Sequence, residues 1–189
     1  MSTAHAELTE LENQLMSLRE RISKLRDERA DPIPGFGLQT LQGQVTLTQL
    51  FGAKDELLVI HNMGIGCSYC TLWADGLNGF VPHLESRASV VLVSPDAPEV
   101  QRAFARDRGW NYLLASDDTR QFSKAMGFYT EEGAQPGISA FHKDINGRIT
   151  RTGSANFGEY DDFCPIWHIL GLLKGGVGEW APKYRYLDV

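Results

Sequence analysis

Short apolar runs alternate with longer amphipathic segments along this chain, and this alternation constrains its fold most strongly. The runs ELLVIHNM (residues 56–63) and SVVLVS (residues 89–94) are rich in β-branched residues, which predicts two buried strands. Four segments have the length and apolar spacing of helices: residues 70–86, 97–108, 117–127 and 160–174. Helices that follow strands in this order indicate an α/β domain.

A predicted hairpin makes the sheet mixed. The runs GISAFHK (residues 137–143) and GRITRTG (residues 147–153) flank Asn146-Gly147, a dipeptide typical of tight turns between antiparallel strands. WNYLLAS (residues 110–116) is a weaker candidate for a further strand. We therefore expect a mixed central sheet flanked by helices.

The N-terminal segment predicts a long helix with one narrow apolar seam. Residues 3–30 are mostly polar, and their large apolar side chains recur every three or four residues: Leu8, Leu11, Leu15, Leu18, Ile22 and Leu25. Such a seam either pairs with its twin in a homodimer or lies on the protein's own body. The prolines and glycines of DPIPGFG predict a linker at 31–37, so we expect a helix over 1–30 and a globular domain over 38–189.

Charge and composition exclude several classes of protein. The 18 basic residues against 24 acidic ones give a net charge of -6, which offers no basic surface for nucleic acid. The first residues lack the features of a secretory signal, and no apolar run approaches the ~20 residues of a membrane span. We therefore expect a cytoplasmic protein that uses its three cysteines for catalysis, metal binding or packing, not in a disulfide framework.

Two of these cysteines, Cys67 and Cys70, follow a predicted strand directly. Cys67 falls where the next helix should begin, and the amide groups and dipole of a helix start stabilise a thiolate. In this spacing the second thiol can attack the first after a mixed disulfide has formed. The pattern predicts a redox pair, with Cys67 as the nucleophile and Cys70 as the resolving thiol.

With these motifs the chain resembles the thioredoxin superfamily, and more closely a bacterial thioredoxin-like family of unknown function that is often labelled a predicted dithiol-disulfide isomerase. The resemblance covers residues 38–174 and rests on LLVIH before CSYC, on the helix TLWADGLNGFVPHL, on QPGISAF and on LQGQVTLTQLFG. It implies a thioredoxin-like fold with an N-terminal helical extension, and a thiol-disulfide oxidoreductase without a cofactor. Its expected partners are a protein or small-molecule disulfide and an unknown reductant.

The resemblance also suggests two further site residues. Pro136 stands where such proteins carry a cis-proline that faces the cysteines, and His61 stands where a thioredoxin strand carries a buried acid. An imidazole there could act as a general base for Cys70. The chain departs from the thioredoxin pattern at Ser68-Tyr69, which lacks the common proline, and at Gly66, which replaces a tryptophan.

Three alternative functions remain open. Cys67 and Cys70 could bind zinc together with Cys164 and His168, although FCPIWHILGLL is typical of a packing helix. A thiol peroxidase is possible, although the Thr-x-x-Cys pattern of peroxiredoxins is absent because position 64 is glycine. The third alternative is a non-enzymatic interaction protein that uses the N-terminal seam. We expect no metal site, and we expect Trp73 to be part of the core.

Overall fold

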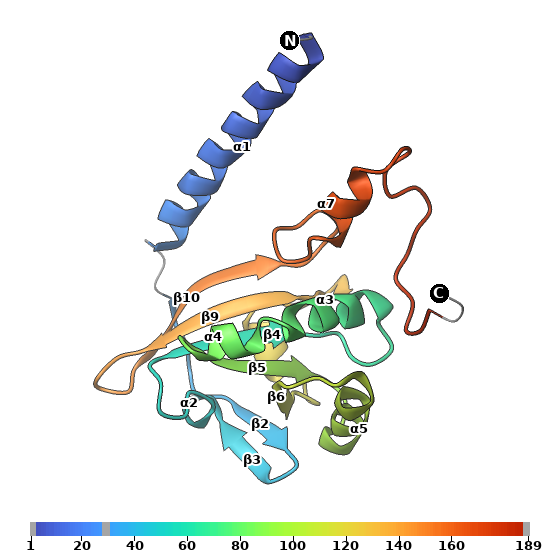
Figure 1. Cartoon of the computed structure of the whole chain (residues 1–189). Helices are drawn as coiled ribbons and strands as arrows, with labels where there is room; N and C mark the ends of the chain where they lie inside the picture. Colours follow the sequence, from blue (N-terminus) through green and yellow to red (C-terminus); the bar gives the residue numbers. More distant parts are fainter. Residues whose placement is uncertain (1–2, 28–30, 187–189) are drawn as a thin grey trace.

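The fold is a mixed sheet of eight strands with helices on both faces, as a computed structural model shows for residues 3–27 and 31–186 (Figure 1). The strand order is β1-β10-β9-β4-β5-β6-β2-β3. The strands are β1 (Asp31–Pro32), β2 (Gly37–Thr40), β3 (Gly43–Thr46), β4 (Glu56–His61), β5 (Ser89–Ser94), β6 (Leu113–Ser116), β9 (Gly137–Lys143) and β10 (Ile149–Asn156). The pairs β4–β5 and β5–β6 are parallel and the others antiparallel, which confirms the mixed sheet. A separate small hairpin joins β7 (Tyr129–Thr130) to β8 (Gly133–Ala134).

Two apolar layers enclose the sheet because successive residues of a strand point to opposite faces. On β4, Val59 belongs to one layer and Ile60 to the other. The layer that contains Ile60 is closed by α3 (Ser68–Asn78), α4 (Val81–Glu85) and α7 (Ile166–Gly171). The opposite layer is closed by α2 (Leu47–Leu50) and α6 (Gln121–Ala125), while α5 (Pro98–Arg108) packs beside β6.

The predicted helices exist but are shorter than expected, and local chemistry explains where they end. The segment 70–86 is divided into α3 and α4, because Pro82 has no N–H to continue the hydrogen bonds of a single helix. The segment 160–174 is helical only from Ile166. Before it, one carboxylate oxygen of Asp161 accepts the backbone N–H of Phe163 at 2.7 Å and of Cys164 at 2.9 Å, which holds a turn.

The segment 31–37 is not simply a linker. Asp31 and Pro32 form β1, which pairs with Arg151 and Thr150 at the edge of the sheet. The proline is compatible with this position because an edge strand does not need every N–H for pairing. The linker prediction therefore missed this strand pairing. Proline ends helices, but an edge strand of a sheet can accept it.

The N-terminal helix α1 (Thr3–Asp27) stands away from the sheet (Figure 1). Every side chain from Ala4 to Leu25 is exposed, and the seam residues Leu8 to Leu25 are 47–66% exposed. An ion pair between Arg19 and Asp162 ties the helix to the body. The seam residues are therefore not buried against the protein's own body. In the described part of the chain, no helix has the length and apolar character needed to cross a membrane.

Candidate functional site

Cys67 is the N-cap residue of α3, at the end of the loop that leaves β4. Its backbone is extended, and its sulfur accepts the N–H of Cys70 at 3.1 Å. Its carbonyl oxygen accepts the N–H of Thr71 at 3.1 Å, which starts the helix. The side chain is partly exposed. Because the sulfur takes the place of a capping oxygen, it meets the helix amides that stabilise negative charge.

Cys70 lies one turn further on and is 3% exposed. A hydrogen bond from the Cys70 thiol lowers the pKa of Cys67 to about 6, against the opposing effect of burial. The same hydrogen bond, followed by burial, raises the pKa of Cys70. The backbone N–H of Met63 approaches the Cys70 sulfur at 3.5 Å. The pair therefore has one sulfur that ionises easily and one that keeps its proton.

The loop before Cys67 is held by a carboxylate from the neighbouring strand. Asp96, just beyond the end of β5, accepts the N–H of Ile65 at 2.9 Å and the hydroxyl of Ser94 at 2.8 Å. The buried amide of Gln101 donates to the same hydroxyl at 2.7 Å. Asp96 was not among the residues predicted from the sequence, although its position in the chain carried a signal. Parallel strands end at the same edge of a sheet, so polar residues after 89–94 were candidates for the same site as Cys67.

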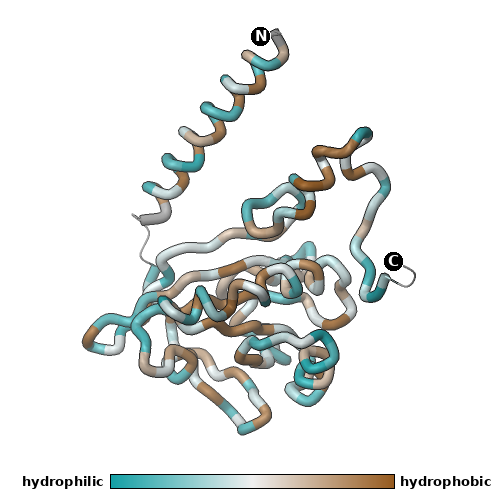
Figure 2. The backbone as a smooth tube through the Cα atoms, in the orientation of Figure 1, coloured by the Kyte–Doolittle hydropathy of each residue, from teal (hydrophilic) through white to brown (hydrophobic). Residues whose placement is uncertain are grey.

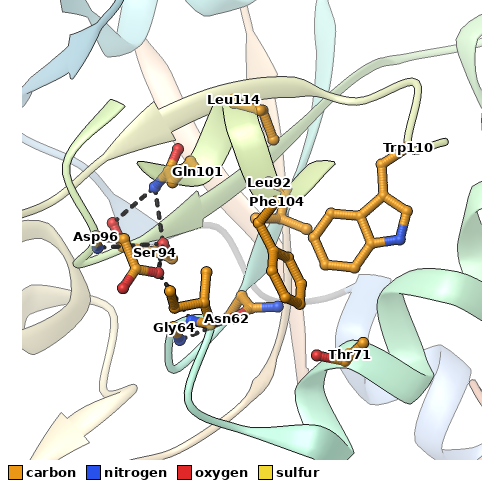
Figure 3. Close-up of a pocket in the computed structure, with 11 residues that line it drawn as sticks. Asn62, Gly64, Thr71, Leu92, Ser94, Asp96, Gln101, Phe104, Trp110 and Leu114 are labelled. Carbon is orange, nitrogen blue, oxygen red and sulfur yellow. Dashed lines mark hydrogen bonds between the residues drawn. The ribbon is translucent and has the colours of Figure 1, made fainter. Parts of the chain in front are cut away.

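Asp96 also fills the space beside Gly64. A Cβ at Gly64 would lie 3.1 Å from an Asp96 oxygen, and its φ of +114° is unfavourable for other residues. These two residues line a small pocket, whose other wall is formed by Phe104 and Trp110 (Figure 3). A side chain at position 64 would meet the carboxylate, so the glycine is a structural requirement.

Aromatic side chains form a wall behind the cysteine pair. Tyr69, between the two cysteines, stacks on Trp167 with ring centroids 5.9 Å apart, and Trp167 is fully buried. Trp73 is 4% exposed and donates from its indole N–H to Asp161 at 2.9 Å, which confirms it as a core residue. The tyrosine in the motif therefore packs α3 against α7.

The C-terminal segment also reaches the site. It runs from α7 past the end of α5 (Figure 1), where the Arg108 guanidinium donates to the carbonyl oxygen of Tyr184 at 2.8 Å. The Tyr184 ring meets Phe104 edge to face, with centroids 6.4 Å apart. Its pKa is raised by burial and then by the charges of Cys67 and Cys70. Tyr184 was not predicted from the sequence, since no local pattern connects it with the cysteines.

His61 is buried on the opposite face of β4 from the wall of aromatic residues. Its Nε2 lies 3.0 Å from the Ser139 hydroxyl, and its ring stacks on Phe128 with centroids 3.9 Å apart. Burial, and then the charge of Arg151, lowers its pKa to about 3. Within the described residues its hydrogen bonds do not include a cysteine. These contacts give no support to His61 as a general base, because a base of such low pKa takes up protons poorly at neutral pH.

We expect His61 to make the protein sensitive to mild acid. Its folded pKa of about 3 lies below the ordinary value of 6.5, so the unfolded chain binds a proton first as the pH falls below 6.5. Stability is therefore lost with falling pH, by about 2 kcal/mol between pH 7 and pH 5. In urea unfolding at both pH values, the free energy of unfolding of His61→Phe should not show this loss between pH 7 and pH 5. An equal loss in both proteins would contradict a buried neutral imidazole.

Pro136 lies where the sequence predicted, but its conformation differs from the prediction. The following residue, Gly137, pairs with His61 across β9 and β4, which places Pro136 at the edge of the sheet where Cys67 lies. The peptide bonds of the described residues are all trans, so the expected cis-proline was wrong. The carbonyl oxygen of Pro136 accepts the N–H of Phe157 at 2.9 Å, which binds it into the hairpin with β10.

The candidate zinc ligands do not come together. Cys164 lies in the turn before α7, where it is 3% exposed among apolar side chains. His168 is on α7 itself, and its exposed ring places Nε2 3.2 Å from the Asp161 carbonyl oxygen. Among residues 3–27 and 31–186, no three Cys, His, Asp or Glu side chains are grouped as metal ligands would be. Cys164 is a small packing residue, and burial raises its pKa.

The fold is similar to those of several peroxiredoxins of known structure. Peroxiredoxin Q of Xanthomonas campestris has a TM-score of 0.55 and 18% identity over 64% of this chain and 79% of its own. A mutant of Xylella fastidiosa PrxQ has 0.57 and 17%, over 68% and 84%. Reduced Prx3 of Vibrio vulnificus, in complex with H2O2, has 0.56 and 17%, over 70% and 86%. These likenesses establish the thioredoxin-like fold.

The family is established by sequence. No curated protein matches the chain. Residues 2–188 match a family described as bacterial protein of unknown function, DUF899, and this match includes α1, the cysteine pair and Tyr184. The chain therefore belongs to the DUF899 family of bacterial proteins, with a thioredoxin-like fold.

Proposed function

We propose that this protein is a thiol-disulfide oxidoreductase that uses Cys67 and Cys70. One observation carries the proposal: a partly exposed sulfur with a pKa of about 6 caps α3, and a buried thiol of raised pKa donates a hydrogen bond to it. A thiolate at neutral pH next to a protonated thiol is the arrangement that a dithiol reductant needs. The peroxiredoxin folds support a thiol oxidoreductase in general.

The reaction proceeds in two exchanges. The Cys67 thiolate attacks one sulfur of a protein or small-molecule disulfide, forms a mixed disulfide and releases the other sulfur as a thiolate. Cys70 then loses its proton and attacks the Cys67 sulfur, which closes the Cys67-Cys70 disulfide and releases the second thiolate. The substrate gains two electrons, and an external thiol reductant restores the pair. The reverse sequence oxidises a dithiol substrate.

The geometry also explains how Cys70 becomes reactive at the right time. Its pKa is raised first by its hydrogen bond to Cys67 and further by the charge of that thiolate. Both effects disappear when Cys67 enters a mixed disulfide, so the pKa of Cys70 falls. The N–H of Met63, 3.5 Å from the Cys70 sulfur, then stabilises the new thiolate. The first exchange therefore activates the second.

A thiol peroxidase is the second candidate, and the likeness to peroxiredoxins favours it. The Cys67 thiolate would attack a peroxide oxygen, release an alcohol or water after protonation, and become a sulfenic acid. Cys70 would then displace water and form the disulfide. Against this candidate, the carboxylate of Asp96 lies beside Gly64, where a peroxide would meet a negative charge instead of a hydroxyl.

Stopped-flow kinetics can separate the two candidates. The reduced protein is mixed at pH 7 with glutathione disulfide in one series and with hydrogen peroxide in another, and tryptophan fluorescence reports oxidation. For each oxidant, the rate constant of the protein is divided by that of a free thiol of similar pKa. We expect this ratio to be larger for the disulfide than for the peroxide. The opposite ranking would assign the protein to the peroxidases. Cys67→Ser is the control for both series.

A further inference from the structure

The apolar seam of α1 is an interaction surface that the protein's own body leaves uncovered. Its six residues are 47–66% exposed, and apolar and polar colours alternate along the whole helix (Figure 2). The ion pair of Arg19 with Asp162 holds the helix beside the body, where Leu15 lines an open groove with Pro165 and His168 but remains 47% exposed. We propose that α1 pairs in an antiparallel coiled coil with α1 of a second copy of this chain.

The spacing of the seam fits a symmetric antiparallel pair. With Leu8 at heptad position a, the seam alternates between positions a and d up to Leu25. In the antiparallel arrangement Leu8 meets Leu25 of the partner subunit, and Leu11 meets Ile22 of the partner subunit. Leu15 and Leu18 meet at the centre, so each of the six residues has an apolar partner. The 25-residue helix is about 37 Å long, enough for these layers.

The charges beside the seam decide the orientation. Glu7 occupies position g and Glu12 position e, so in a parallel pair these like charges would face each other twice. In the antiparallel pair, positions e face each other, and Glu12 meets Arg19 of the partner subunit. The acidic start of each helix then lies along the basic end of the other. The two helix dipoles are also antiparallel, which is favourable.

Disulfide crosslinking tests the orientation. Leu11→Cys and Ile22→Cys are introduced separately into full-length Cys67→Ser/Cys70→Ser/Cys164→Ala protein, whose folding is checked by circular dichroism. After mixing and oxidation, an antiparallel pair should yield the disulfide between residue 11 of one chain and residue 22 of the other. Disulfides only between identical positions would show a parallel pair and overturn the proposal. This test does not depend on redox activity.

Charge reversal gives opposite results for the two orientations. For an antiparallel pair, Glu12→Arg should raise the dissociation constant of the dimer roughly tenfold, and Glu12→Arg/Arg19→Glu should restore it. For a parallel pair, Glu12→Arg would remove the repulsion by Glu7 and tighten the dimer. Asp162→Ala is the control, because it removes the ion pair within one chain and should leave the dimer intact.

Analytical ultracentrifugation of the full chain supplies the measurement. The expected species has twice the mass of the 21.1 kDa chain and separates into monomers when Leu15 and Leu18 are replaced by Glu. A monomer at every soluble concentration would overturn the proposal. So would a dimer that survives Leu15→Glu/Leu18→Glu, or a monomer that binds lipid vesicles through α1.

Discussion

Cys67→Ser is expected to abolish disulfide exchange, while Cys70→Ser should still perform the first attack and then stop. Serine at position 67 leaves no thiolate, so we expect turnover to fall by roughly 10³-fold or more. In Cys70→Ser the mixed disulfide with a small disulfide should accumulate, because no thiol remains to release the substrate. Intact-mass spectrometry after mixing with glutathione disulfide distinguishes the two variants.

The pH dependence of alkylation tests the same assignment in the unmodified protein. With a pKa of about 6, roughly half of Cys67 is ionised at pH 6, whereas an ordinary cysteine of pKa about 8.5 is less than about 1% ionised. Iodoacetamide at pH 6 should therefore label Cys67 first, and Cys70 and Cys164 much later. Turnover that survives Cys67→Ser, or first labelling of Cys70, would contradict the proposed roles.

Cys164→Ala is the matched control for these experiments. Its sulfur is buried in the core, with a raised pKa, and its structural neighbours are apolar. We expect its turnover and mixed-disulfide chemistry to equal those of the unmodified protein. Loss of turnover without loss of folding would make Cys164 a third member of the redox relay.

Gly137→Ala is expected to destabilise the fold severely. The added Cβ would lie far inside van der Waals contact with the Phe128 ring and with the carbonyl oxygen of Ala155. Phe128 cannot move freely because it stacks on buried His61, and the carbonyl belongs to the paired strand β10. We expect a loss of about 3 kcal/mol or more in the free energy of unfolding. Urea titration followed by circular dichroism measures this loss.

Gly153→Ala provides the control in the same hairpin. A Cβ at Gly153 would have no neighbour within 4 Å, and the residue is outside the left-handed region. We expect its free energy of unfolding to change by less than about 0.5 kcal/mol. Equal stability of the two alanine variants would mean that the backbone around Gly137 relaxes readily, contrary to the close packing of its neighbours.

The sequence predicted the position of Cys67 at a helix start because this position depends on short-range interactions. The strand 56–61, the turn after it and the first turn of α3 are contiguous, and the N–H that caps Cys67 comes from a residue only three positions away. The strands 89–94 and 137–143 were also predicted with their observed bounds, because their apolar patterns are continuous.

Predictions failed where side chains or distant strands compete with local preference. Asp161 takes up amide groups that the helix predicted at 160–174 needed, so α7 begins later. Pro32 was assigned to a linker, yet it pairs at the edge of the sheet with Thr150, which is far away along the chain.

The alternation of the main strands and helices from β4 onward and the placement of Cys67 at a helix start were determined by the sequence, since apolar periodicity and capping act between near neighbours. The surroundings of the thiolate were decided only by the tertiary structure. Asp96 reaches Ile65 across 31 positions, and Tyr184 reaches Phe104 from the far end of the chain. Packing also left the α1 seam exposed. Such contacts follow from how the whole sheet brings distant segments together, which no local pattern encodes.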